Sequence, residues 1–225
     1  NMTANFKKLF PHIFTIIGFV LLFLLGTWQL NRLEWKENLT QKINTRINAA
    51  PITAVTNVAD DEFRIINLTG TYDYAHELQI MGRPFNGKPG VHVLTPLKTP
   101  QGTVVINRGW AKYDESYNKP QGIVNVQGII RTTQKLSFIN KHIVMDNNPS
   151  KNVWFWVDLP AIYKFVAAQE LPYYVEQVSS NKPNSYPYAL PKQINLYNEH
   201  LNYAITWYAL SIALLIMYYY RFHRK

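Results

Sequence analysis

Hydrophobic residues along this chain concentrate in two uncharged stretches near its ends. Residues 13–30 read IFTIIGFVLLFLLGTWQL and residues 203–220 read YAITWYALSIALLIMYYY. Each is close to the length that a helix needs to cross about 30 Å of hydrocarbon, so we expect two transmembrane helices. A cleaved signal peptide is the alternative for the first stretch, but its apolar run is long for one and no small-residue cleavage site follows.

The flanking charges predict an orientation. Lys7 and Lys8 precede the first stretch, whereas Arg221, Arg224 and Lys225 follow the second, and neither tail contains an acid. Because Lys and Arg accumulate on the cytoplasmic side, we expect cytoplasmic termini and an outward central domain. The short leading tail argues against a mitochondrial transit peptide, so we expect a bacterial inner membrane and a periplasmic central domain.

Between the two stretches the periodicity changes from helical to β. Large apolar residues recur every fourth position from Trp35 to Ile47, which predicts that the first helix continues to about residue 50, before Pro51. Residues 91–97 alternate in polarity, TPQG follows at 99–102, and residues 103–107 are suited to a return strand. This pattern predicts a β-hairpin.

Other short segments suggest further strands and one helix. The strand candidates are residues 63–68, 78–81, 123–132, 143–145 and 173–178. Asp158 is a candidate N-cap for a helix that Pro172 ends. We therefore expect an α+β membrane protein in which two transmembrane helices bracket a mainly antiparallel sheet, or partly closed barrel, with one helix.

These patterns divide the chain into seven segments. They are a cytoplasmic tail (1–12), a transmembrane helix (13–30), a juxtamembrane helix (31–50), an extracytoplasmic mainly-β domain (51–182), a Pro-rich linker leading into the second helix (183–202), a second transmembrane helix (203–220) and a cytoplasmic tail (221–225).

Composition narrows the possible functions. The 225 residues include no cysteine, which excludes disulfides, Cys-ligated metal centres and covalent haem attachment through CxxCH. The basic net charge of +9 is explained partly by topology, and no nucleic-acid-binding motif is present. Hydrolase, metalloprotease and P-loop motifs are also absent, so we expect no enzyme. Asp60, Asp61 and Glu62 form the one acidic cluster; we expect a solvated loop, with a cation site as the alternative.

His200 is the strongest candidate for ligand chemistry. It stands three residues before the second apolar stretch, and Ala204, Trp207 and Ser211 share its helical face. The small Ala204 would leave room above the imidazole, and Trp207 would supply an aromatic wall. A flat apolar macrocycle with His200 as axial ligand fits this face. The alternative is an interfacial histidine at the start of the helix.

The first helix offers a possible partner for such a ligand. Trp28, Arg32 and Trp35 share a face at the expected outer boundary, where Arg32 could pair with a haem propionate. The alternative is an aromatic belt with a snorkelling arginine. Gly18, Leu22 and Gly26 share another face, which favours close helix packing.

Five motifs resemble a known family. They are LGTWQLNRLEWKENL from Leu25, GVHVLTPL from Gly90, INRGW from Ile106, NVWFWVD from Asn152 and NEHLNYAITWYAL from Asn198. In this order they resemble the Surfeit-locus-protein (Shy) family of cytochrome c oxidase assembly factors. Residues 111–150 show little resemblance.

The resemblance implies a function beyond what the residues show by themselves. It implies binding of haem a, its insertion into cytochrome c oxidase subunit I, and haem a synthase as a further partner. It also implies that His200 is the haem ligand. It gives no secure role to the first-helix motif residues Trp28, Gln29 and Arg32 or to the R-G-W residues Arg108, Gly109 and Trp110. A haem-free scaffold for an oxidase intermediate is the alternative, and a membrane-anchored enzyme is a third possibility.

Overall fold

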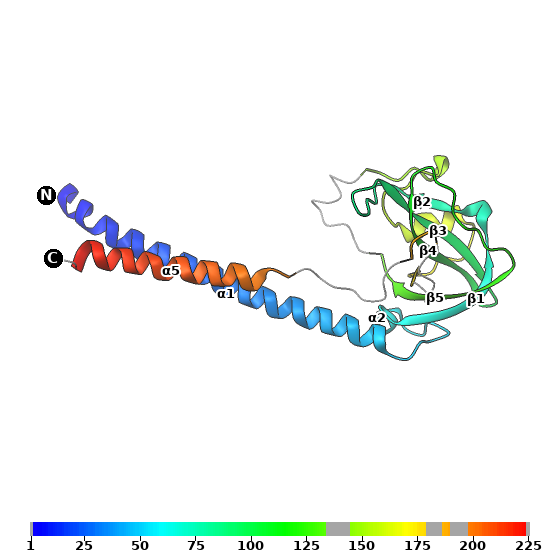
Figure 1. The fold of residues 1–225 in the computed structure, drawn as a ribbon, viewed down its shortest axis with the longest axis horizontal. Coiled ribbons are helices and arrows are strands. Elements are labelled where there is room, and N and C mark those ends of the chain that lie inside the picture. Colours follow the sequence, from blue (N-terminus) through cyan, green and yellow to red (C-terminus); the bar gives the residue numbers. More distant parts are fainter. Residues whose placement is uncertain (1, 134–144, 179–185, 190–197, 224–225) are drawn as a thin grey trace. The chain divides into compact units, whose positions relative to one another are not determined.

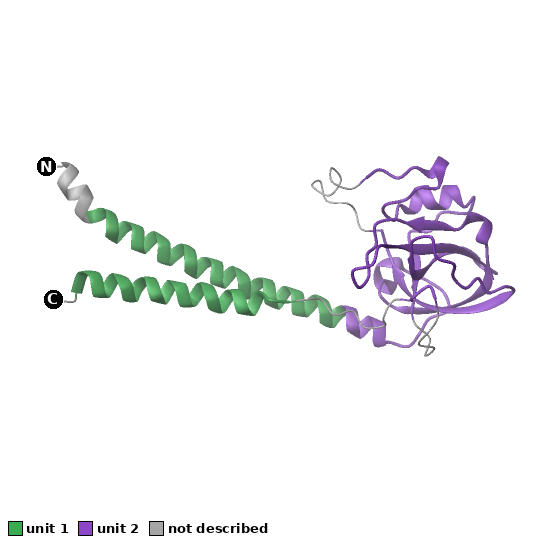
Figure 2. Ribbon diagram, turned by 45° about the horizontal axis from the view of Figure 1, so that its top comes forward, with its two compact units in different colours: residues 1–42, 195–225 green, residues 43–194 purple. Residues whose placement is uncertain are grey.

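The computed structural model describes residues 2–133, 145–178, 186–189 and 198–223, with side chains from residue 9 onward. It divides into two compact units (Figure 2). The helical unit comprises residues 1–42 and 195–225, and the sheet unit comprises residues 43–194. Each is described separately below.

The helical unit contains two long helices that lie side by side in Figure 1. Helix α1 spans Met2–Asn48 and helix α5 spans His200–His223. Both are long and apolar enough to cross a bilayer. Large apolar side chains along them are exposed, such as Phe14 at 62% and Met217 at 62%, as suits contact with lipid. The α1 helix continues without a break from the first apolar stretch to Asn48, as the four-residue repeat predicts.

Small residues on α1 allow the two helices to approach closely. A Cβ atom at Gly26 would lie 2.8 Å from Tyr208 Cε1, and one at Gly18 would lie 3.1 Å from Leu214 Cδ2. The Thr27 hydroxyl lies 3.0 Å from the Tyr208 hydroxyl, which adds an interhelical hydrogen bond. These contacts confirm that the glycine face packs against the second helix.

The sheet unit is a six-stranded, partly closed barrel. Its strands are β1 (Ile65–Tyr72), β2 (Leu78–Ile80), β3 (Gly90–Thr99), β4 (Gly102–Lys112), β5 (Ile123–Arg131) and β6 (Tyr174–Gln177). Their order is β1-β5-β6-β4-β3-β2, and a further pairing of β1 with β3 closes the sheet. All pairings between named strands are antiparallel except β4 with β6. The structure therefore confirms a mainly antiparallel domain.

The predicted hairpin is β3–β4, which pairs from Thr99↔Gly102 to Gly90↔Lys112. The register shifts between Val93 and Leu94, so that Arg108 is left opposite no residue. Such a bulge re-aims a side chain. At this bulge Arg108 is buried and pairs with Glu77.

Helix α4 (Leu159–Phe165) packs on the sheet. Asp158 is its N-cap, accepting a hydrogen bond from the Ala161 amide, as predicted. The helix ends at Phe165, well before Pro172, and Ala167 just beyond it adopts a positive φ of 52°. One core lies between α4 and the sheet, around the fully buried Trp154. The buried residues of a second core, which include Leu97 and Ile106, all lie on strands.

Three short helices complete the described elements. They are α2 (Val58–Asp61), η1 (Tyr74–His76) and η2 (Pro149–Lys151). The acidic cluster is not the solvated loop that the sequence predicts, because Asp61 in α2 is only 4% exposed. Its carboxylate accepts hydrogen bonds from the Thr56 and Asn57 amides and pairs with Arg64.

The ends of the sheet unit differ from the predicted segment boundaries. The last turns of α1 belong to it, since Ile43 and Ile47 are buried. Within the expected linker, Tyr188 pairs with Trp110 on β4 through two backbone hydrogen bonds. The described part of the linker is therefore docked on the sheet. Most of the expected strand at 143–145 lies outside the described residues, and Met145 is not in a strand.

Candidate functional site

His200, the first residue of α5, is held by a side chain of α1. Its Nδ1 atom lies 2.7 Å from Gln29 Oε1. A carbonyl oxygen only accepts hydrogen bonds, so Nδ1 carries the proton and donates it. The lone pair of the neutral ring is then on Nε2. This arrangement is typical of histidines that bind a metal through one nitrogen while the other is held by a neighbour.

The α5 face below His200 is turned toward α1. Ala204 is 1% exposed and Ser211 is 2% exposed, whereas Trp207 is partly buried. Ala204 therefore has almost no free surface in this structure. The Trp207 indole Nε1 is buried and has no hydrogen-bond acceptor within the described part of the chain. A buried N–H without a partner is unusual and costs free energy.

No hydrogen bond, ion pair or ring contact joins Trp28 or Arg32 to His200 among the described residues. Trp28 is 56% exposed. The Arg32 guanidinium lies 4.0 Å from the centre of the Trp35 ring, a cation–π contact on α1 itself. This contact agrees with the aromatic-belt interpretation. The Arg32 charge lies near the end of the helix pair that carries His200.

Sequence reasoning gave Gln29 no chemical role, although the structure makes it the partner of His200. The available signal was a polar side chain inside an apolar stretch, three residues after Gly26 on the packing face. Polar residues within membrane spans are often functional.

The other histidines that the structure describes have ordinary surroundings. His12 bonds to Tyr218, His76 pairs with Asp73, and His142 lies outside the described residues. His92 is buried in the sheet unit, where burial and the nearby Arg83 charge lower its pKa to about 4. In the described part of the chain, no three His, Asp or Glu side chains are grouped to hold a metal ion.

The R-G-W motif builds a buried charge network in the sheet unit. Arg108 is 5% exposed, and its Nη1 lies 3.4 Å from Glu77 Oε2. It also donates to the Asn118 carbonyl, and it lies over the rings of Tyr72 and Tyr117.

Glu77 is satisfied from several sides. It accepts hydrogen bonds from the Thr95 hydroxyl at 2.7 Å and the Tyr117 hydroxyl at 2.8 Å, and it pairs with Lys119 at 2.9 Å. So many partners indicate a structural network rather than a group free for chemistry.

The other two residues of the motif hold the docked segment. Gly109 has a φ of +117° and approaches the Tyr188 backbone so closely that a Cβ atom would clash with it. The Trp110 ring stacks on Tyr188 at 6.0 Å, and its Nε1 donates to the Arg83 carbonyl at 2.6 Å. The residues of the R-G-W motif therefore have structural roles in the sheet unit.

Comparison with known proteins identifies the family. The sequence profile of the SURF1 family matches residues 16–212. The chain belongs to the SURF1 family. Surfeit locus protein 1 of Mus musculus is 29% identical over 226 residues, covering 89% of this chain and 72% of that protein. The Takifugu rubripes protein of the same name is 30% identical over 227 residues, covering 89% of this chain and 92% of its own.

Family membership confirms the resemblance seen in the five motifs. It supports the coarser functional expectation, a role in cytochrome c oxidase assembly, because the SURF1 family is an assembly-factor family and not a known enzyme family. It also lets a further SURF1 motif, NVWFWVD, be interpreted from the structure. Trp154 fills the core and Asp158 caps α4, whereas Trp156 lines a cavity.

Proposed function

We propose that this SURF1-family chain binds haem a at the end of the α1–α5 pair that carries His200, and assists its insertion into cytochrome c oxidase subunit I. The observation that carries the proposal is the His200–Gln29 hydrogen bond at 2.7 Å. It fixes the imidazole and its tautomer, so that Nε2 is free to bind iron. Haem a is cargo in this proposal, and the chain performs no turnover.

The residues near His200 fit this cargo in part. The buried Trp207 N–H lacks an acceptor among the described residues, and Trp207 lies two helical turns along the face of His200. Arg32 is three residues beyond Gln29, about one turn along α1, and makes no ion pair within the described residues. Arg32 would pair with a propionate and Trp28 would contact the edge of the macrocycle. The buried Ala204 requires the macrocycle to lie beside the helix pair and not between its helices.

The proposal includes a place and partners. The place is a bacterial inner membrane with a periplasmic sheet unit, and the acid-free basic tails support cytoplasmic termini. Haem a synthase would supply the haem and oxidase subunit I would receive it, each meeting the chain within the lipid bilayer.

A visible absorption spectrum tests the haem proposal. The full chain is purified in detergent from cells that make haem a, as wild type and as His200→Ala, Gln29→Ala and His12→Ala. We expect co-purified haem in the wild type and its loss, or shifted Soret and α bands, in His200→Ala. Gln29→Ala should weaken haem retention about 10- to 100-fold, as is usual when the partner of a metal-binding histidine is removed.

His12→Ala is the matched control, since His12 also bonds across the helix pair, to Tyr218 at 2.5 Å. It should keep the wild-type spectrum. Arg32→Ala should reduce retention less than His200→Ala, because an ion pair at a wet interface is weak. An unchanged spectrum in His200→Ala would contradict the proposal.

A haem-free scaffold is the second candidate. The observation that favours it is the burial of Ala204, which leaves that position of the α5 face without free surface for a ligand. Oxidase intermediates that co-purify with a haem-free wild-type chain would support this alternative.

A further inference from the structure

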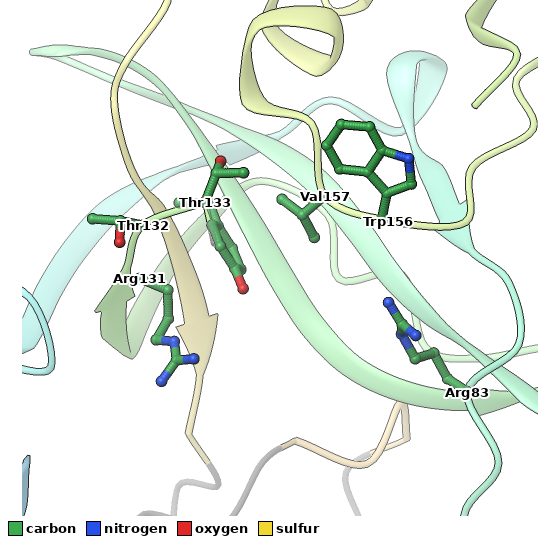
Figure 3. Close-up of a pocket in the computed structure, with 7 residues that line it drawn as sticks. Arg83, Arg131, Thr132, Thr133, Trp156 and Val157 are labelled. Atoms are coloured by element: carbon green, nitrogen blue, oxygen red, sulfur yellow. The ribbon is translucent and has the colours of Figure 1, made fainter. Parts of the chain in front are cut away.

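A second candidate site lies in the sheet unit, far in sequence from His200. It is a cavity of about 240 Å³ where the end of β5, strand β6, the loop after β2 and the segment before α4 meet (Figure 3). Its lining includes two arginines, two threonines, a tryptophan and a tyrosine: Arg83, Arg131, Thr132, Thr133, Trp156 and Tyr174. The volume is below the roughly 300–1,000 Å³ of common small-molecule sites, so it suits a small ligand and not a macrocycle.

The cavity contains one guanidinium group without a carboxylate partner. Two carboxylates lie at its edge, because Glu176 Oε2 is 3.5 Å from Arg131 Nε and Glu62 accepts hydrogen bonds from Thr132. Arg83 has no carboxylate within ion-pairing distance in the described part of the chain, and its guanidinium donates a hydrogen bond to the Phe155 carbonyl at 3.2 Å. His92 adds no charge near neutral pH, since burial and Arg83 depress its pKa to about 4.

Polar atoms at this cavity lack hydrogen-bond partners. Thr133 Oγ1 is buried and has no partner among the described residues. Arg131 Nε is also buried without a well-formed hydrogen bond there, since its ion pair with Glu176 is long. Thr132 differs, because its hydroxyl donates to Glu62 Oε1 at 2.5 Å. Buried polar groups are usually satisfied, so two such atoms at one cavity indicate a missing acceptor.

The remaining wall is apolar and aromatic. Figure 3 shows the Arg83 guanidinium directed toward the Trp156 side of the cavity, with Val157 beside it. Guanidinium groups bind carboxylate and phosphate oxygens through charge-assisted hydrogen bonds, and a tryptophan face accepts a flat apolar body.

We propose that this cavity binds a small organic anion, whose carboxylate or phosphate accepts hydrogen bonds from Arg83 and Thr133 and whose apolar part packs against Trp156. The site is independent of His200, and neither proposal needs the other to hold.

Isothermal titration of the detergent-purified full chain tests the site. The probes are benzoate, inorganic phosphate and benzamide, which has the ring without the charge. We expect one saturable site for benzoate or for phosphate, and the better probe identifies the acidic group. No saturable binding of either anion would overturn the proposal, as would benzamide binding as tightly as benzoate.

Variants locate the binding. Arg83→Gln should weaken the better anion at least tenfold, whereas Lys164→Gln, which removes an exposed positive charge on α4, should not change it. Thr133→Val is the sharper test, because it removes a buried hydroxyl that has no partner among the described residues. It should weaken anion binding severalfold while leaving the melting temperature unchanged or higher. If Arg83→Gln does not fold, Thr133→Val decides alone, and wild-type affinity in Thr133→Val would then overturn the proposal.

Discussion

Arg108 and Lys119 both pair with Glu77, but their different exposure to water should make their contributions to stability unequal. The Arg108 side chain is 5% exposed and the Lys119 side chain is 45% exposed. Removing one partner from a buried pair leaves an uncompensated charge, whereas an exposed pair is screened by water. The distances alone would not predict this difference, because both cations lie near the same carboxylate.

We therefore predict that Arg108→Met lowers the free energy of unfolding by about 3–5 kcal/mol. Lys119→Met should cost less than about 1 kcal/mol, because its ammonium is largely solvated. Thermal unfolding of the two variants in detergent measures both. Equal losses would contradict the predicted difference between the buried and the exposed partner of Glu77.

Asp61 predicts a pH dependence of stability. Burial raises the pKa of its carboxyl, but hydrogen bonds from Thr56, Asn57 and Arg64 outweigh burial and hold the pKa below its usual value. A lowered folded pKa adds stability above the unfolded pKa of about 3.9, and this stability is lost as the pH falls through the folded pKa. Asp61→Asn should thus cost about 1–3 kcal/mol at pH 7 and much less near pH 3. Melting temperatures at both pH values measure the difference; a constant gap between variant and wild type would contradict it.

Gly26 predicts a defect in the helix pair. Gly26→Glu would put a carboxylate side chain against the Tyr208 ring, whose Cε1 atom would lie only 2.8 Å from a Cβ atom at this position. A charge within a span costs up to a few kcal/mol, and its volume blocks close helix approach. We expect less accumulated protein or lower oxidase activity, with a milder effect from Gly26→Ala. Normal levels of both in Gly26→Glu would argue that this position faces lipid.

At the scale of elements, local sequence signals located most of the fold. The β3–β4 hairpin and the Asp158 cap formed where turn residues and capping chemistry predict them. The parallel β4–β6 pairing was not predictable, because Ile106 and Val175 are joined through a long intervening segment. The end of α4 was also missed, since the chain turns at Ala167 before reaching Pro172.

These elements predict the spectrum of the sheet unit. Residues 43–194, expressed without the rest of the chain, should give far-UV circular dichroism dominated by β structure, with a small helical contribution from α4 and the end of α1. A folded fragment with a dominantly helical spectrum would contradict the described sheet. An unfolded fragment would show instead that the sheet unit depends on the helices for stability.

At the scale of the whole molecule, the two apolar helices and their basic tails predict membrane topology. Alkaline phosphatase inserted at the exposed turn near Gln101 should be active, because that turn would be outside the cytoplasm, and a fusion after Lys225 should be inactive. The tails hold five basic residues and no acid. The opposite orientation would place these basic residues outside the cytoplasm, against the usual distribution of Lys and Arg. The opposite activities would reject the proposed orientation of the sheet unit and of His200.

The two spans, the main hairpin and the family could all be predicted from the amino-acid sequence, because uncharged runs, turn residues and motif order are properties of neighbouring residues. Which side chains meet depends instead on tertiary packing. Gln29 and His200 are 171 positions apart, and Arg108 pairs with Glu77 at a bulge in the β3–β4 pairing. The burial of Asp61 and the docking of Tyr188 on Trp110 also depend on tertiary packing. Contacts of this kind depend on how distant segments pack, and no local periodicity records that packing.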